Sequence, residues 1–130
     1  MARLMGIDYG ARRIGVALTD TDGRVAFPKA VIPNDRFLLG ALKALVTGHE
    51  VSEVIIGESK DNRGVENPVA HSARVLGQEL ETDLGVTIHY EPEFWTSQEV
   101  RAHTGERAVD AEAATIILNS FLTKRHGSHD

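Results

Sequence analysis

The spacing of apolar residues changes once along this chain, and the change limits the folds that the chain can adopt. In the first part, apolar residues alternate with other residues, as Ile14, Val16 and Leu18 do, which is the period of a strand. The turn signal Asp22-Gly23 separates two of these runs. The predicted strands cover residues 3–9, 13–20 and 24–32. The chain is therefore expected to open with an antiparallel meander.

After the meander, helical and extended segments alternate. Helices are predicted over residues 36–48, 68–83, 97–104 and 111–124, and strands over 51–57 and 86–90. Asn34 and Asp35 can cap the first of these helices. The run around Ile55 suits a strand buried on both faces. This order predicts an α/β domain over residues 1–124. Its five-stranded mixed sheet would consist of the meander and two parallel strands, with helices flanking the sheet. A flexible tail is expected over 125–130.

Composition excludes several kinds of site. The 130 residues contain no cysteine, so disulfide bridges, thiolate zinc sites and cysteine nucleophiles are excluded. None of the six histidines falls at a metal-ligand spacing. No apolar run approaches the roughly 20 residues of a membrane span, and residues 1–6 are too short and polar for a secretory signal. We therefore expect a cytoplasmic protein without membrane contact.

Asp8 lies near the end of the first predicted strand, where a charge costs several kcal/mol unless it is paired or bound to a metal. The alternative is a turn aspartate that bonds its own backbone before Gly10. Ligands of mixed α/β sheets bind beyond the carboxyl ends of the central strands. Asp8 is therefore a candidate ligand-binding acid.

Asp110 precedes the last predicted helix, and aspartate is a favoured helix N-cap. It also shares one helical face with Ala114, Ile117 and Phe121. That face is apolar, so it is expected to pack on the sheet. Asp110 is then directed toward the sheet and can reach the end of the first strand.

Three further acids, Glu58, Glu91 and Glu93, follow the two later strands. Each one taken singly is typical of a solvated loop. Together with Asp8 and Asp110 they would gather carboxylates at one end of the sheet. Oxygen ligands without cysteine or histidine select Mg²⁺ or Mn²⁺, and such a cluster suits in-line phosphoryl displacement.

Basic and amide side chains are predicted to rim the same end of the sheet, where they could hold phosphates. They are Arg12, Arg13, Lys60, Asn62 and Arg63. Ordinary solvated surface charge explains each of them equally well. The net charge of −5 argues against coating nucleic acid by bulk attraction, but a metal-dependent nuclease needs only an acidic centre and a local basic rim.

Two segments carry a family resemblance. Residues 5–20 (MGIDYGARRIGVALTD) closely resemble the first two strands of the YqgF family, also called RuvX, and residues 109–122 (VDAEAATIILNSFL) resemble its closing helix. The resemblance extends in order and length over nearly the whole chain. It implies an RNase H-like fold and the nuclease activity of that family, described for Holliday junctions and for 16S rRNA maturation.

The resemblance also implies the catalytic acids. The family's first aspartate falls on Asp8 and its last acid on Asp110. Its stretch Asp-Glu-Arg-Leu-Thr-Thr corresponds to residues 92–97 (PEFWTS), which keep the glutamate as Glu93 and the first threonine. Glu91 could replace the lost aspartate. Because an acid lies near Glu58 in related resolvases, Glu58 is a rival second ligand.

The resulting hypothesis is a nuclease that uses Mg²⁺ (or Mn²⁺) on structured RNA or branched DNA. Its expected partner is the precursor of the small ribosomal subunit, and it acts as a monomer or a homodimer. Asp8, Glu93 and Asp110 are the expected catalytic acids, and they bind the metal together with Glu58. One rival is a binding module with the same fold and a weakened site. A second rival is a phosphotransferase of the actin and sugar-kinase type, but such enzymes need two domains of this kind.

Overall fold

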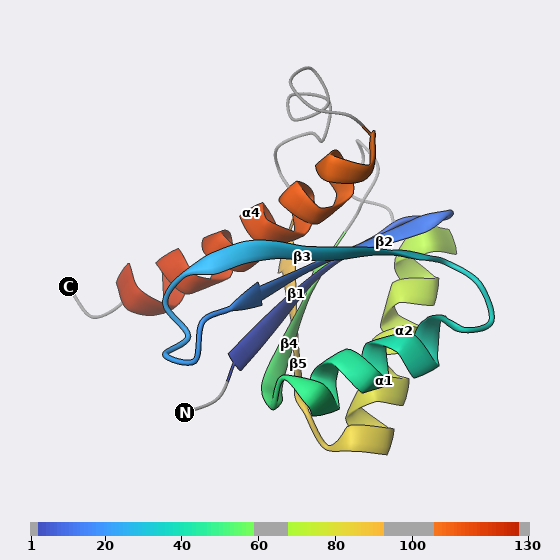
Figure 1. Ribbon diagram of the computed structural model, residues 1–130, viewed down its shortest axis with the longest axis horizontal. Coiled ribbons are helices and arrows are strands. Elements are labelled where there is room, and N and C mark those ends of the chain that lie inside the picture. Colours follow the sequence, from blue (N-terminus) through green and yellow to red (C-terminus); the bar gives the residue numbers. More distant parts are fainter. Residues whose placement is uncertain (1–2, 59–67, 93–105, 128–130) are drawn as a thin grey trace.

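A five-stranded mixed sheet separates two layers of helices (Figure 1). The computed structural model describes residues 3–58, 68–92 and 106–127, but not the side chains of 106–109 and 126–127. The strands are β1 (Arg3–Tyr9), β2 (Arg13–Thr19), β3 (Ala26–Pro33), β4 (Val51–Glu58) and β5 (Thr87–Pro92). Their spatial order is β3-β2-β1-β4-β5, with antiparallel pairs in the meander and parallel pairs from β1 to β4 and from β4 to β5. The expected fold class is confirmed.

The two faces of the sheet carry different helices (Figure 1). Helices α1 (Leu38–Gly48) and α2 (Pro68–Leu84) cover one face, and α4 (Glu106–Gly127) covers the other. The predicted helix over 97–104 lies outside the described residues. Within the described part of the chain, no helix is long and apolar enough to cross a membrane.

The alternation of each strand assigns side chains to one face or the other. Met5 and Ile7 of β1 pack with α1 and α2, whereas Leu4 packs under α4. In β4, Val54 and Ile56 belong to the first face and Ile55 to the second. β4 is therefore buried on both sides, as its uninterrupted apolar run predicted.

The start of α1 differs from the prediction that Asn34 and Asp35 cap it. The helix begins at Leu38, and no side chain caps its first turn. Asn34 Nδ2 instead donates to the carbonyl of Gly10 (2.8 Å), and Asp35 Oδ1 accepts from the Phe37 N–H (2.9 Å). The prediction of these caps is wrong because Asn34 bonds to the turn between β1 and β2, and Asp35 bonds within the connection that leads into the helix.

The end of the chain also differs in its limits. β5 runs on to Pro92, so Glu91 lies inside the strand rather than after it. α4 begins at Glu106 and continues to Gly127, past Lys124, where we expected a tail to begin. Both extensions matter for the site, because they fix where acidic and basic side chains fall.

Candidate active site

Two strand glycines allow α4 to lie unusually close to the sheet. A Cβ atom on Gly15 of β2 would lie 1.8 Å from the backbone oxygen of Asp110. A Cβ atom on Gly6 of β1 would lie 2.7 Å from the backbone oxygen of Ala114. Real side chains do not tolerate such distances, so only glycine fits at these two positions. The helix backbone therefore rests directly on the strands.

This close approach brings Asp110 to the end of β1. Asp110 lies over Gly15, and Gly15 is the direct partner of Asp8 in the antiparallel register. Asp8 is two residues beyond Gly6 on β1, so its side chain is on the same face as α4. The structure thus brings together the first and last acids that the sequence predicted, from opposite ends of the chain.

Asp110 is a buried carboxylate with a basic partner. Only 8% of the residue is exposed, and Arg13 at the start of β2 donates from Nε to its Oδ2 atom over 2.7 Å. An ion pair of this kind offsets much of the cost of burying the charge. The N-cap alternative for Asp110 is wrong, because α4 begins at Glu106 and Asp110 lies within the helix.

Asp8 is half-buried and precedes the last residue of β1. The turn after β1 is closed by a backbone hydrogen bond from the Gly10 N–H to the carbonyl of Arg13 (3.0 Å). The carbonyl of Gly10 in turn accepts the bond from Asn34. These bonds close the turn through the backbone and Asn34, and the Asp8 side chain lies on the α4 face of the sheet.

Glu91 is the most deeply buried carboxylate of the described residues, at 2% exposure. It pairs with Gly57 of β4, and its side chain is on the α4 face. Lys124 of α4 donates to both of its carboxylate oxygens, over 2.6 and 3.2 Å. Gly57 follows Ile56, the partner of Ile7 in β1, so it lies between Asp8 and Glu91 and places no side chain between them.

Glu58 lies on the opposite face. It is the last residue of β4, next to Gly57, and it forms an ion pair with Arg74 of α2. The Arg74 guanidinium also stacks over the ring of Tyr90, 4.7 Å from the ring centre. The structure therefore does not bring the Glu58 side chain to the face that carries Asp8 and Asp110.

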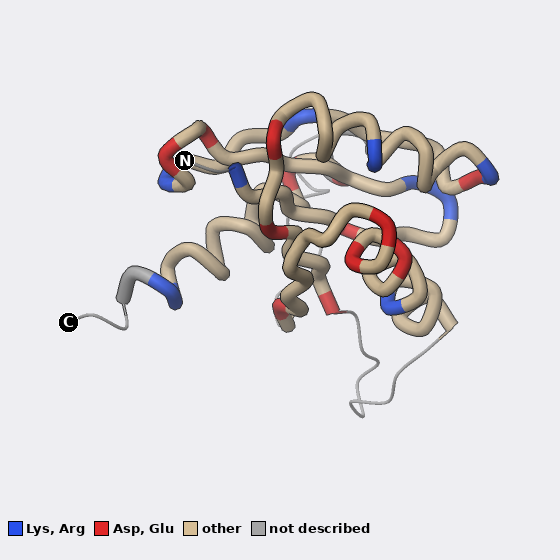
Figure 2. Tube along the Cα trace, turned by 90° about the horizontal axis from the view of Figure 1, so that it is seen from below, with Lys and Arg blue, Asp and Glu red and all other residues tan. Residues whose placement is uncertain are grey.

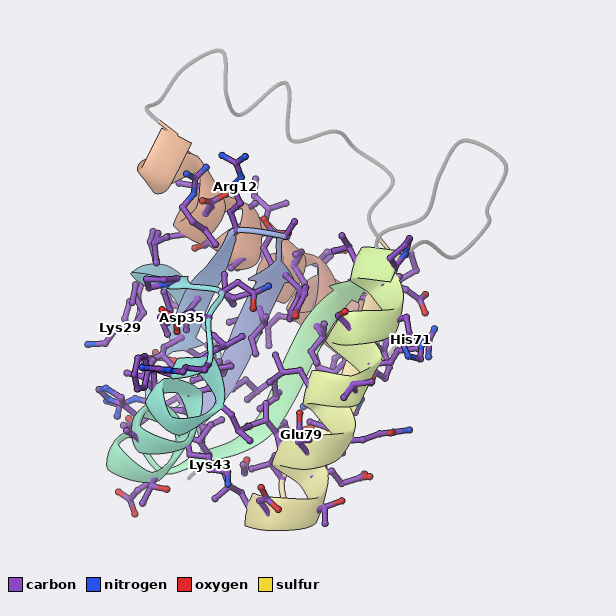
Figure 3. The ribbon with its side chains drawn as sticks, turned by 90° about the vertical axis from the view of Figure 1, so that its right-hand side faces the viewer. Arg12, Lys29, Asp35, Lys43, His71 and Glu79 are labelled. Atoms are coloured by element: carbon purple, nitrogen blue, oxygen red, sulfur yellow. The ribbon has the colours of Figure 1, made fainter. Side chains whose placement is uncertain are left out.

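The predicted basic rim is described only in part. Arg12 is exposed in the turn between β1 and β2 and projects past the end of the sheet beside the start of α4 (Figure 3). Arg13 is engaged with Asp110. Glu93 and three rim residues fall outside the described residues; the three are Lys60, Asn62 and Arg63.

The surface of α2 is acidic toward its C-terminal end. Acidic residues gather along α2, where Glu79, Glu81 and Asp83 accompany one arginine (Figure 2). A phosphate backbone would be repelled by that surface. On the other side of the sheet, Arg12 and Arg13 lie at the edge of the α4 face.

A family model described as RuvX, Holliday junction resolvase, matches residues 2–124. The chain belongs to the RuvX family. The resemblance drawn from the two end segments is therefore confirmed, and RuvX membership supports the expected nuclease function.

Curated relatives of this RuvX chain are similar over nearly their full length. A protein of Opitutus terrae is 34% identical over 134 residues, which cover 95% of this chain and 92% of the relative. A protein of Novosphingobium aromaticivorans is 33% identical over 137 residues, which cover 96% and 87%. Both carry the provisional name pre-16S rRNA nuclease.

Solved structures with the same architecture are Holliday junction resolvases. T. thermophilus RuvC in complex with a Holliday junction substrate has a TM-score of 0.66 at 15% identity, and 96% of each chain is covered. The fowlpox virus Holliday junction resolvase has a TM-score of 0.60 at 11% identity, covering 94% of this chain and 99% of that one. At such identities the similarity concerns the fold alone, and it confirms the RNase H-like architecture.

The donor chemistry of the RuvX site fits a hard divalent cation. Asp8 and Asp110 present carboxylate oxygens on one face, and the chain contains no thiol. Within residues 3–58, 68–92 and 106–127, no group of three or more acidic or histidine side chains is close enough to hold a metal. A third ligand from the same face would complete such a set.

Two functional contacts were missed by sequence reasoning. The pairing of Arg13 with Asp110 joins residues 97 positions apart, and no local pattern signals it. The pairing of Lys124 with Glu91 was missed because Glu91 was placed after the strand over 86–90, and no local pattern links it to the end of the last helix. The glycines inside β1 and β2 were a usable signal, since glycine in a strand often marks a close backbone approach.

Proposed function

We propose that this RuvX-family chain is a metal-dependent nuclease that hydrolyses phosphodiester bonds of structured nucleic acid at a site formed by Asp8, Asp110 and Glu93. One observation carries the proposal. Gly15 allows the backbone of Asp110 to rest on β2 beside Asp8, and Arg13 supports the buried Asp110 carboxylate there. A sheet that needed only an apolar core would have no reason to place these two carboxylates on one face.

Asp8, Asp110 and Glu93 would hold Mg²⁺ or Mn²⁺, whereas the rival ligand Glu58 pairs with Arg74 on the opposite face. Glu91 shares the α4 face with Asp8, but both of its carboxylate oxygens accept from Lys124, and no three acids of the described residues lie close enough to hold a metal. When bound, the metal would polarise the phosphate and lower the pKa of the attacking water.

The remaining chemistry comes from the chain itself. Arg13 holds Asp110 in one orientation and reduces the repulsion between the two aspartates. Arg12 extends past the sheet, where it can contact a phosphate next to the reacting one. The close packing of α4 keeps Asp110 fixed relative to β1, so the carboxylates do not have to be ordered when substrate binds.

The proposed substrate is the precursor of 16S rRNA. Support comes from the provisional names of the relatives in Opitutus terrae and Novosphingobium aromaticivorans. A branched DNA junction is the second candidate substrate, because the family model carries the description Holliday junction resolvase. Both are structured, polyanionic nucleic acids, and both require cleavage of a phosphodiester bond.

The test uses a labelled 16S precursor fragment and, in parallel, a labelled four-way DNA junction, each with Mg²⁺, Mn²⁺ or EDTA. Cutting should require the metal and should fall by at least about a hundredfold in Asp8→Asn, because the variant removes one carboxylate charge from the site. Asp22→Asn is the matched control, since Asp22 is exposed in the turn between β2 and β3 and should cut normally. Equal activity of the two variants would contradict the proposed site.

The competing function is a nucleic-acid-binding module. It is favoured by the Lys124 side chain on Glu91, which already neutralises that buried carboxylate. In that case the wild type and Asp8→Asn would bind the RNA or the junction equally well, and neither would cut it with any metal.

A further inference from the structure

A groove lies between the edge strand β3 and the start of α4, on the same face of the sheet as Asp8 and Asp110. Its volume is about 760 Å³, and the residues that line it include Arg13, Pro28, Lys29, Val31, Pro33 and Ala111. Arg13 also donates to Asp110, and Ala111 is the next residue of α4. The groove therefore adjoins the candidate catalytic pair and shares one side chain with it.

The backbone of β3 explains why the groove is open. β3 is an edge strand, and its register against β2 shifts where Val16 pairs with Ala30 but Ala17 pairs with Pro28. Lys29 is the extra residue of this bulge, and bulges redirect a side chain while they bend the strand. In Figure 3, Lys29 projects outward on the side away from α2. The small Ala111 side chain opposite leaves the space between strand and helix unfilled.

The chemistry of the walls selects one kind of occupant. Pro28, Val31 and Pro33 provide apolar surface, and Lys29 and Arg13 provide positive charge. No carboxylate is among the described lining residues, although the chain as a whole has a net charge of −5. A nucleotide combines an apolar base with an anionic phosphate, and strand-binding proteins recognise both parts at once.

The size of the groove indicates whether that nucleotide can be paired within a duplex. Pockets of about 300–1,000 Å³ hold small molecules, and a single nucleotide is in that class. A base that is stacked and paired within a duplex has no free face to offer to such walls. The groove can therefore take a base only from an unpaired or splayed strand.

We propose that the groove between β3 and α4 binds one unpaired nucleotide next to the scissile phosphate, so that the preferred substrate has a single-stranded flank at the cutting site. The position of this nucleotide next to a cut phosphate rests on the proposed nuclease function. The binding of an unpaired nucleotide does not, and it is measured without cleavage.

The test compares a short RNA hairpin that carries a single-stranded tail with the same hairpin ending blunt, both in EDTA so that neither is cut. Fluorescence anisotropy gives the dissociation constants. The tailed hairpin should bind about tenfold more tightly than the blunt one, because one base and one phosphate are added to the contact. A 2-aminopurine in the tail should brighten on binding, since no described lining residue is aromatic and the base leaves its stacked neighbours.

Variants assign the preference to the groove. Lys29→Gln should lower the salt dependence of tailed binding by about 0.7 in log–log slope, the value of one phosphate contact on a single strand. Val31→Gln should abolish the brightening and reduce the tenfold preference to about twofold, because it replaces apolar wall with an amide. Arg24→Gln is the matched control for Lys29→Gln, as Arg24 is an exposed cation in the turn at the other end of β3.

The outcomes separate this proposal from the proposed function. A preference for the tail that Lys29→Gln and Val31→Gln remove, and Arg24→Gln retains, supports the groove whether or not the protein cuts RNA. Equal binding of the two hairpins, no binding of either, or a preference that survives both groove variants overturns it. Thermal unfolding of each variant, followed by circular dichroism, confirms that the substitutions leave the fold intact.

Discussion

The two faces of the sheet are built in different ways. The face under α1 and α2 is a conventional core in which large apolar side chains such as Met5, Leu42 and Ile56 fill the space. The face under α4 uses glycine and alanine to bring backbone against backbone, and it buries the charged residues Glu91 and Asp110. Both faces bury apolar side chains, but only the α4 face also buries carboxylates, beside backbone contacts that fix their positions.

The two faces differ in how strongly a substitution destabilises them. Apolar packing tolerates changes of shape at a few kcal/mol, because neighbouring side chains relax. Backbone contacts cannot relax in this way. The position of Asp110 therefore depends on the absence of a single side chain, at Gly15, more than on any attractive contact.

The largest expected effect comes from filling that space. Gly15→Ala should lower the free energy of unfolding by about 3 kcal/mol, because the new methyl group overlaps the backbone of Asp110 and α4 must move. Nuclease activity should fall with it. Gly40→Ala in α1 is the matched control, since a Cβ atom there meets nothing within 4 Å and should stabilise the helix by about 0.5–1 kcal/mol.

Urea denaturation measures both variants, and activity is compared under conditions where both are folded. If Gly15→Ala were as stable as the wild type, the close approach of α4 would not be a constraint. The contrast between the two faces would then lose its basis.

The same contrast shows which features of the fold and of the candidate site could be predicted from the sequence. The two-residue period in β2 and the apolar run of β4 supported the prediction of a mixed sheet, because burial determines the pattern of each strand. Asp8 and Asp110 were found because their residue type conflicts with an apolar setting. These signals are local, and the sequence contains them in full.

Other features depend on information that no local pattern carries. Glu58 and Gly57 are neighbours, and a shift of one residue in register exchanges the faces on which they lie. The sequence therefore left Glu58 as a rival ligand, whereas the structure pairs it with Arg74 on the far face. The start of α4 was placed too late, because the favourable N-cap character of Asp110 competes with the tertiary packing that extends the helix back to Glu106.

The next effect compares one ion pair from each face. Lys124→Met should lower the free energy of unfolding by about 2 kcal/mol, because it leaves the Glu91 side chain, which is 3% exposed, charged and without its cation. Arg74→Met should cost about 1 kcal/mol, because the Glu58 side chain is 16% exposed and water can replace the guanidinium.

A second substitution tests whether the unpaired charge of Glu91 causes the loss of stability. Adding Glu91→Gln to Lys124→Met should recover about half of the loss, since the unpaired charge is then gone. Lys124→Met and Arg74→Met could instead lower the free energy of unfolding equally, with no recovery in the double variant. An unpaired carboxylate would then cost no more on the α4 face than on the other face.

The smallest expected effect is that the two faces respond to opposite ends of the pH range. On the α4 face, hydrogen bonds from Arg125 to Glu53 (2.8 and 3.1 Å), with a lesser share from His89, hold the pKa of Glu53 below its usual 4.5. Because the folded pKa is the lower one, this stabilisation is present above about pH 4.5 and is lost as the pH falls through the folded pKa. The Arg125 side chain is 38% exposed, so solvent screening limits the stabilisation from this ion pair to about 0.5 kcal/mol.

On the other face, burial raises the pKa of Tyr90 above its usual 10.0. The folded protein then holds the phenol proton more tightly than the unfolded chain, so stability falls as the pH rises above 10.0. Urea denaturation at a series of pH values measures both effects. Glu53→Gln should flatten only the acid side of the stability profile, and Tyr90→Phe only the alkaline side. The two groups lie on opposite faces of one sheet. A variant that flattened both sides of the stability profile would therefore show that the two faces are coupled through the strands. The difference between the faces would then concern their packing and not their contributions to stability.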